Sequence, residues 1–177
     1  MIKTLRTIVG IGIVSELPPA QDDTLRVREA LQQEVLSVLG RALCIRHVDA
    51  GSCNACELEI HALNNPIYNI EGLGIRFVAS PRHADMLLVT GPVSRHMLTA
   101  LRRTYDATPD PKLVVAVGDC GCNGGIFGTS YATVGSVSAV LPVDVAVPGC
   151  PPSPVRLLQG ILTAIRQSVG DRTLKAL

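Results

Sequence analysis

Tryptophan is absent from this chain of 177 residues, and aromatic residues make up 3% of it. The net charge is +1, so the chain lacks the basic excess that binds nucleic acid, and we expect no nucleic-acid partner. There is also no G-x-x-x-x-G-K-[ST] loop and no dinucleotide fingerprint. Hydrophobic residues amount to 47%, and such an aliphatic chain suits a buried parallel sheet or a subunit that partners cover.

Long apolar runs are missing as well. Ile8–Val14 is far shorter than the roughly 20 residues of a transmembrane helix. No small-residue cleavage site follows it, so we expect no secretory leader. Lys3 and Arg6 beside this run suit contact with a membrane surface or a partner, and a loosely ordered tail is the alternative. The expected compartment is a reducing cytoplasm, where clustered cysteines bind metal more often than they form disulfides.

Alternating strand and helix patterns predict the fold class. Apolar runs rich in branched residues predict strands at Leu43–Val48, Ile75–Ala79, Met86–Thr90, Leu113–Val117 and Val143–Val147. Segments with helical spacing lie between them, at Glu57–Leu63 and Arg95–Tyr105, and after the last one, at Val155–Ile165. Strands that are apolar on both faces and separated by helices indicate an α/β fold, with a parallel sheet and helices on both faces.

One further helix is predicted ahead of this α/β unit. Its apolar face consists of Val27, Leu31, Val35 and Val38. Gly40 ends the helical pattern. We therefore expect an N-terminal extension with one amphipathic helix over residues 1–41, followed by the α/β domain over residues 42–177.

Five of the six cysteines lie in three short motifs framed by glycine and proline. These are Gly51-Ser-Cys53-Asn-Ala-Cys56-Glu57, Gly118-Asp-Cys120-Gly-Cys122-Asn-Gly-Gly125 and Pro148-Gly-Cys150-Pro-Pro152. Each motif follows a predicted strand, and parallel strands present their carboxyl ends at one edge, so we expect the cysteines to converge there. A Cys-x-x-Cys pair and two distant single cysteines can surround one metal centre. The proline after Cys150 favours iron–sulfur over zinc, because a cluster's closing ligand often reads Cys-Pro.

The predicted ligands are Cys53, Cys56, Cys120 and Cys150. Ala55 begins a helix, whose positive N-terminus should lower thiolate pKa values and donate hydrogen bonds to cluster sulfurs. Cys122 is the alternative to Cys120, or a thiol beside the cluster. Cys44 lies inside a strand and is expected to be a small buried apolar residue. Structural zinc and a disulfide-linked fold remain the rival interpretations.

Other polar residues allow a structural and a functional interpretation. Glu57 follows the second cysteine in the first turn of a helix, where its charge is favourable. Alternatively it is a proton relay, since burial beside a cluster can raise a carboxyl pKa into the working range. Arg82 and His83 either make structural contacts, such as Arg82 with Asp85, or meet a partner. Thr90–Val93 is a candidate for part of the cluster wall.

Four stretches together resemble the 20 kDa subunit family of respiratory complex I: Gly51–Glu59, Ser80–Asp85, Gly118–Gly125 and Pro142–Pro154. They are more similar still to the small subunit of membrane-bound energy-converting [NiFe] hydrogenases and formate hydrogenlyase. Complex I subunits typically carry two adjacent cysteines in the first motif, whereas Cys53-Asn-Ala-Cys56 has the hydrogenase-type spacing. The resemblance covers about residues 42–165.

This resemblance implies a flavodoxin-like fold, one [4Fe–4S] cluster and no activity of the subunit alone. The cluster would lie against a large catalytic subunit, either a [NiFe] subunit or one like the 49 kDa subunit of complex I. A ferredoxin-like subunit with two clusters and a membrane subunit would complete the complex. The implied role is electron transfer for hydrogen and proton chemistry, with delivery to quinone as the alternative. The implied location is the cytoplasmic face of the cell membrane, as a peripheral subunit.

Overall fold

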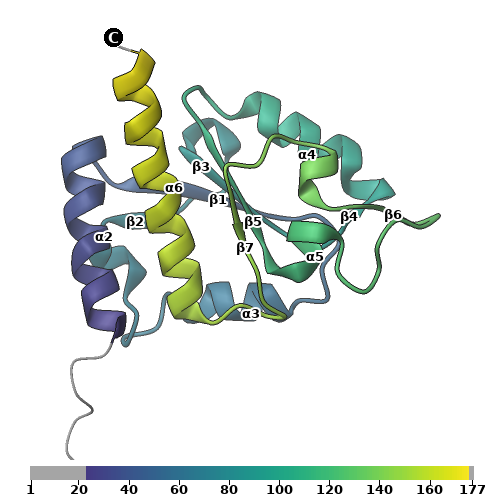
Figure 1. The fold of residues 1–177 in the computed structure, drawn as a ribbon, viewed down its shortest axis with the longest axis horizontal. Coiled ribbons are helices and arrows are strands. Elements are labelled where there is room, and N and C mark those ends of the chain that lie inside the picture. The colour runs from purple at the N-terminus through teal and green to yellow at the C-terminus, as the bar shows by residue number, and fades with distance from the viewer. Residues whose placement is uncertain (1–22, 176–177) are drawn as a thin grey trace, which may run out of the picture.

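A five-stranded parallel sheet forms the centre of the computed structural model, which describes residues 23–175 (Figure 1). Its strands are β1 (Leu43–Asp49), β2 (Ile75–Phe77), β3 (Met86–Thr90), β5 (Leu113–Val117) and β7 (Val145–Val147). They lie in the order β2-β1-β3-β5-β7, which is the flavodoxin-like order with its switch point between β1 and β3. The predicted α/β fold is confirmed.

The backbone register brings four strand ends to the same level. Asp49, Thr90, Val117 and Val147 are partners across β1, β3, β5 and β7. Each of them is the last residue of its strand. The four loops that follow therefore start side by side, at the carboxyl edge of the sheet.

Helices cover both faces of the sheet (Figure 1). One face carries α2 (Asp23–Leu39), α3 (Ala55–Ala62) and α6 (Pro154–Lys175), and the other carries α4 (Arg95–Ala107). Short 3₁₀ helices lie at η1 (Ile70–Leu73), η2 (Pro81–His83) and η3 (Val137–Ala139). None of the helices between residues 23 and 175 is both long and apolar enough to span a bilayer.

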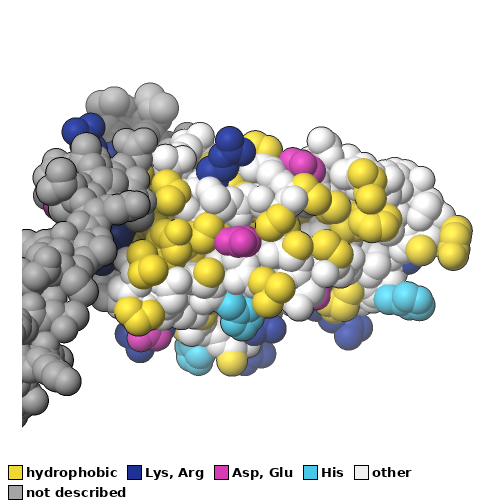
Figure 2. Space-filling view, turned by 90° about the horizontal axis from the view of Figure 1, so that it is seen from below, with side chains coloured by type: hydrophobic (Ala, Val, Ile, Leu, Met, Phe, Trp, Pro, Cys, Tyr) yellow, Lys and Arg dark blue, Asp and Glu magenta, His cyan; other side chains and the backbone are white. Residues whose placement is uncertain are grey.

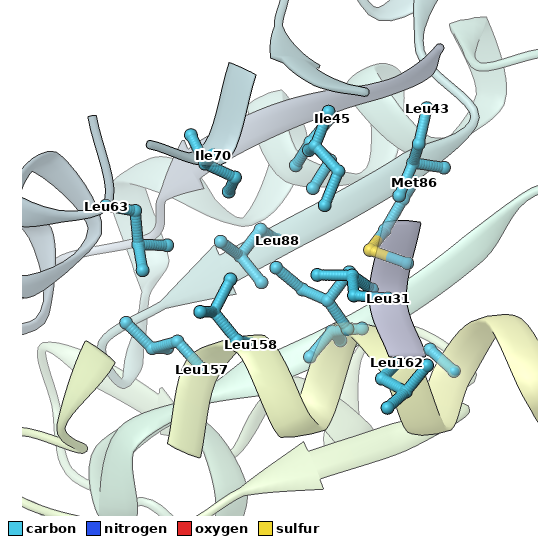
Figure 3. Close-up of a cluster of buried hydrophobic side chains, with 14 of the residues drawn as sticks. Leu31, Leu43, Ile45, Leu63, Ile70, Met86, Leu88, Leu157, Leu158 and Leu162 are labelled. Atoms are coloured by element: carbon cyan, nitrogen blue, oxygen red, sulfur yellow. The ribbon is translucent and has the colours of Figure 1, made fainter. Parts of the chain in front are cut away.

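The central strand β3 shows why the sheet is apolar on both faces. All five of its residues are buried, and successive side chains point to opposite sides. Met86 and Leu88 join the cluster under α2, α3 and α6, whereas Leu87 and Val89 join the cluster under α4. Figure 3 shows Leu88 in the middle of the first cluster, near Leu158 of α6.

The helix α2 packs against α6 and contributes to the main core. Leu31 and Val35 are fully buried there, as the predicted apolar face requires, while the side chain of Val38 lies outside the described part. The boundary after residue 41 stays a prediction. Residues 1–22, with the Ile8–Val14 run and its two basic neighbours, also lie outside the described residues.

Two aspartates extend the sheet at the amino ends of its strands. The Asp85 N–H donates to the carbonyl of Cys44 at 2.7 Å, and the Cys44 N–H donates to the Asp85 carboxylate at 3.0 Å. Asp144 forms the same reciprocal pair with Val114, at 2.9 and 2.7 Å. Both aspartates therefore hold neighbouring strands in register.

No hydrogen bond or ion pair joins Arg82 to Asp85, the contact offered as one structural role for Arg82, among the described residues. Asp85 instead accepts two hydrogen bonds from the guanidinium of Arg41, which follows α2. Arg82 and His83 lie on η2, at the surface. Because Arg41 is distant from Asp85 in sequence, local spacing could not indicate this pair.

Three elements at the carboxyl edge were not predicted. The strands β4 (Val93–Ser94) and β6 (Thr133–Gly135) form a small antiparallel pair. The helix α5 (Gly118–Asn123) occupies part of the expected glycine-rich turn. Elements of two, three and six residues are too short to show a hydrophobic period.

Candidate metal centre

The first cysteine pair is presented by the turn between β1 and α3. The carboxylate of Asp49 accepts the N–H groups of Gly51 and Ser52, both at 2.8 Å, and so closes the turn. Burial acts to raise the pKa of Asp49, but these N–H donors outweigh it and lower the pKa below its ordinary value. The chain then places Cys53 just before α3 and Cys56 in its first turn.

The segment Thr90–Val93 packs against this turn, and its place in the wall of a cluster site stays a prediction. The Ala50 N–H donates to the carbonyl of Thr90 at 3.0 Å, and the Ser94 N–H donates to the carbonyl of Ala50 at 2.7 Å. A Cβ atom on Gly91 would lie 2.6 Å from the backbone nitrogen of Ser52. This position therefore has no room for a side chain.

The second and third motifs are joined by a reciprocal pair of hydrogen bonds. The Asp119 N–H donates to the carbonyl of Gly149 at 2.9 Å, and the Gly149 N–H donates to Oδ1 of Asp119 at 2.8 Å. Cys120 and Cys150 follow these two residues directly, so the pair sets their separation. Asp119 was not singled out from the sequence. Its position directly before the predicted ligand Cys120 was the one local feature that could have indicated its role.

Two glycines bring the cysteine motifs into contact. Gly118 has a φ of +79°, and a Cβ atom there would lie 2.6 Å from the sulfur of Cys56. A Cβ atom on Gly125 would lie 2.7 Å from the sulfur of Cys120. The second motif thus packs closely around the sulfur of Cys120 and against the sulfur of Cys56 in the first motif.

The thiols of the four predicted ligands lie within electrostatic range of one another. Cys53 and Cys150 are exposed, whereas Cys56 and Cys120 are partly buried. Burial raises the pKa of Cys56 to about 12, with further contributions from Glu57 and from the other three thiols. Burial also raises the pKa of Cys120, with contributions from Cys150 and Cys53.

The expected lowering of thiolate pKa values by the N-terminus of α3 is therefore wrong for Cys56. Desolvation and neighbouring negative charge outweigh the dipole of an eight-residue helix. Ionising several of these thiols together would be costly, and a bound metal centre would offset both the desolvation and the repulsion.

The two remaining cysteines point elsewhere. The Cys122 thiol is 3.7 Å from the carbonyl of Ala116 in β5 and donates to it. Its pKa is raised by burial and then by Asp119, with no contribution from another cysteine. Cys44 lies in β1 as predicted, partly rather than fully buried, near the opposite edge of the sheet. The geometry therefore favours Cys120 over Cys122 as the neighbour of the other three thiols.

Four cysteine thiols are a donor set that both zinc and iron–sulfur clusters use. Within residues 23–175, no three His, Cys, Asp or Glu side chains approach closely enough to hold one metal ion. A tetrahedral zinc ion would draw its thiolates to about 3.8 Å from one another, since Zn–S bonds are ~2.3 Å. An iron–sulfur cluster contains several metal atoms and holds its thiolates farther apart. The close glycine contacts at Gly118 and Gly125 leave space beside the sulfurs that larger residues would fill.

Glu57 is buried beside this group of thiols. Its side chain is 6% exposed, and neither carboxylate oxygen has a hydrogen-bond partner among the described residues. The nearest ionisable nitrogen is Nε2 of His47, 3.7 Å from Oε1 of Glu57. His47 lies in β1 and was not singled out from the sequence, because nothing local links a strand histidine to a helix carboxylate.

These features define a class: a flavodoxin-like α/β protein that carries a group of thiols at the edge where relatives of this fold bind ligands. Residues 53–164 match the family described as NADH ubiquinone oxidoreductase, 20 Kd subunit. The chain belongs to this family, as its resemblance implied.

Similar proteins are subunits of multisubunit oxidoreductases. The probable membrane-bound hydrogenase subunit mbhJ of Pyrococcus furiosus is 43% identical over 143 residues, which cover 79% of this chain and 86% of that one. Formate hydrogenlyase subunit 7 of Escherichia coli is 42% identical over 77% of this chain, which spans 53% of that protein. One subunit of the NADH-quinone oxidoreductase of Desulfovibrio desulfuricans is 45% identical over 70% of this chain and 66% of its own length.

Solved structures agree with the fold. A chain of the membrane-bound sulfane sulfur reductase, an archaeal respiratory membrane complex, matches with a TM-score of 0.63 and 34% identity. The match covers 72% of this chain and 70% of that one. A chain of the NAD⁺-reducing [NiFe]-hydrogenase shares the fold, with a TM-score of 0.51 and 19% identity over 64% of this chain and 85% of its own.

The raised pKa of Cys56 predicts how the metal-free chain reacts. A pKa of about 12 leaves roughly one Cys56 thiol in 10,000 ionised at pH 8, and the thiolate is the reactive form. We expect iodoacetamide to modify Cys56 far more slowly than the exposed Cys150, with a rate that rises about tenfold per pH unit. Site-resolved mass spectrometry measures both rates, and similar rates at pH 8 would contradict the burial argument.

Proposed function

We propose that this chain is the electron-transfer subunit of a membrane-bound hydrogenase-type oxidoreductase. It holds one [4Fe–4S] cluster beside the catalytic large subunit and is inactive alone. The observation that carries this proposal is the convergence of three cysteine motifs at one sheet edge, in a member of the complex I 20 kDa subunit family. The proposed ligands are Cys53, Cys56, Cys120 and Cys150.

The exposure of this edge supports a role in electron transfer between subunits. Cys53 and Cys150 are exposed, so a cluster there would reach the protein surface. The chain's contribution is to hold the cluster by its thiolates and to tune its potential with backbone N–H groups and nearby charges. A partner that covers this edge would exclude water and bring its own redox centre close to the cluster.

Large apolar side chains beside the motifs support such a partner. Leu58, on α3, is 63% exposed. Ile126, next to Gly125, is 94% exposed and Tyr131 is 93% exposed. Figure 2 shows the side of the molecule on which α3 lies, with hydrophobic side chains spread across it between separated charged ones. We propose that Leu58, Ile126 and Tyr131 contribute to the surface that the partner covers.

The proposed complex follows from the family. A large catalytic subunit, of the [NiFe] type or like the 49 kDa subunit of complex I, covers the cysteine edge. A ferredoxin-like subunit with two clusters exchanges electrons with this subunit, and a membrane subunit anchors the assembly. We propose a peripheral position at the cytoplasmic face of the membrane.

The hydrogenase branch is preferred on two observations. The first motif has the Cys53-x-x-Cys56 spacing, and relatives from Pyrococcus furiosus and Escherichia coli are named as subunits of a hydrogenase and of formate hydrogenlyase. Delivery of electrons to quinone is the second candidate, favoured by the relative from Desulfovibrio desulfuricans. The similarity to a sulfane sulfur reductase adds a third electron acceptor to test.

Activity of the purified complex separates these branches. We expect hydrogen evolution from a low-potential electron donor, measured by gas chromatography, to exceed both quinone reduction and sulfide release from polysulfide. Each assay starts from the same preparation and the same donor concentration. Quinone reduction without hydrogen evolution would move the assignment to the complex I branch, and sulfide release alone would move it to sulfur reduction.

Replacement of single cysteines tests the ligand set. We expect Cys150→Ser to abolish the electron paramagnetic resonance signal of the reduced cluster, because a serine hydroxyl ionises far less readily than a thiol and binds iron more weakly. Cys122→Ser and Cys44→Ser are the matched controls, since their thiols point away from the group, and both should retain the full signal. A normal signal in Cys150→Ser would refute its assignment. Zinc without iron or labile sulfide in the wild-type protein would indicate a structural scaffold instead.

Glu57 has a second proposed role as a proton relay toward the large subunit. Its burial without a hydrogen-bond partner among the described residues supports this role, since a structural carboxylate would normally be paired. We expect Glu57→Gln to lower turnover at least tenfold while the cluster signal keeps its intensity, because the amide cannot carry the proton. Unchanged turnover would leave only the structural role at the start of α3.

A further inference from the structure

The buried pair of His47 and Glu57 lies between the sheet and the cysteine edge. Glu57 follows the proposed ligand Cys56 on α3, whereas His47 comes from β1. Nε2 of His47 is 3.7 Å from Oε1 of Glu57 and 3.1 Å from Oγ1 of Thr90. One imidazole nitrogen therefore faces two oxygen atoms on different elements.

The position of Thr90 assigns the tautomer of His47. The Thr90 side chain is fully buried, and its hydroxyl lies 3.4 Å from the carbonyl of Val48, to which it donates. The Thr90 oxygen is then free to accept a hydrogen bond from the Nε2–H group of His47. Burial lowers the pKa of His47 below its ordinary value, even though Glu57 acts to raise it. The imidazole is thus neutral at neutral pH; its Nε2–H donates to Oγ1 of Thr90 at 3.1 Å, and the same nitrogen lies 3.7 Å from Oε1 of Glu57, which is too far for a hydrogen bond.

We propose that His47 is a positioning residue for the Glu57 carboxylate and, through that carboxylate, sets the reduction potential of the centre at Cys56. This inference rests on the proposed function, because it requires a cluster at the cysteine edge. His47 touches neither the proposed ligands nor a substrate in this arrangement. Its effect comes from the N–H dipole that faces an otherwise unpartnered buried carboxylate among the described residues.

The sign of the effect follows from electrostatics. A negative charge beside a cluster opposes the arrival of an electron and lowers the midpoint potential, and burial of Glu57 leaves this field weakly screened. The positive end of the His47 N–H dipole offsets part of the carboxylate field. Loss of the N–H donor should therefore lower the potential, and loss of the carboxylate charge should raise it.

The test measures the midpoint potential of the cluster in the purified complex, by redox titration followed with electron paramagnetic resonance. We expect His47→Phe to shift the midpoint to lower potential and Glu57→Gln to shift it to higher potential. The double variant should have the same midpoint as Glu57→Gln alone, because His47 acts through that carboxylate. Signal intensity in each sample shows whether the cluster has assembled.

Three further variants sharpen the test. His47→Gln places an amide N–H near the position of Nε2 and should restore the wild-type midpoint. Thr90→Val keeps the side-chain shape but removes the competing acceptor, so the N–H group turns to Glu57 and the midpoint should rise. His61→Gln is the matched control, since His61 is exposed on α3 beside the same surface hollow as His47 and should leave the midpoint unchanged.

The outcomes are distinct. An unchanged or raised midpoint in His47→Phe, with full signal intensity, would overturn the inference while leaving the proposed function standing. The inference would also be overturned if His47→Phe shifted the midpoint by the same amount in the Glu57→Gln protein as in the wild type. His47 would then act on the cluster directly and not through the carboxylate of Glu57. The absence of an iron–sulfur signal in the wild-type complex would instead overturn the proposed function.

Discussion

Four parallel strands of the sheet end at the same level, and the rest of this structure depends on that constraint. Asp49, Thr90, Val117 and Val147 are register partners, so the loops after them begin in one row. A slip of one residue in any pair would turn the side chains of that strand to the opposite face and displace its loop. The fully buried β3 makes such a slip costly, because its side chains fill the cores on both faces.

The cysteine edge combines features that are unfavourable in the protein alone. Thiols with raised pKa values lie close together, and Glu57 is buried without a partner among the described residues. Local conflicts of this kind concentrate at functional sites, where a bound group or a partner offsets their cost. A metal centre would neutralise the thiolates, and Nε2 of His47 lies 3.7 Å from the carboxylate of Glu57.

Sequence patterns predicted the elements that have a clear period or a strong local signal. The runs Met86–Thr90 and Leu113–Val117 became β3 and β5 with the same bounds, because branched apolar residues buried on both faces have few alternatives. The short α5 and the β4–β6 pair were missed, since they are stabilised by neighbours rather than by their own pattern. Asp119 was missed for a related reason: its partner Gly149 is 30 residues away.

By itself, the sequence determined the fold class, the family and the three cysteine motifs, because periodicity, turn residues and ligand spacing are local properties. Only the tertiary structure decided which thiols face one another. The α5 helix directs Cys122 back to the carbonyl of Ala116 and leaves Cys120 with the other motifs. The tertiary structure also pairs Asp85 with Arg41 rather than with Arg82, and it places His47 beside Glu57. Side-chain direction and long-range partners follow from packing, which no single stretch of the chain encodes.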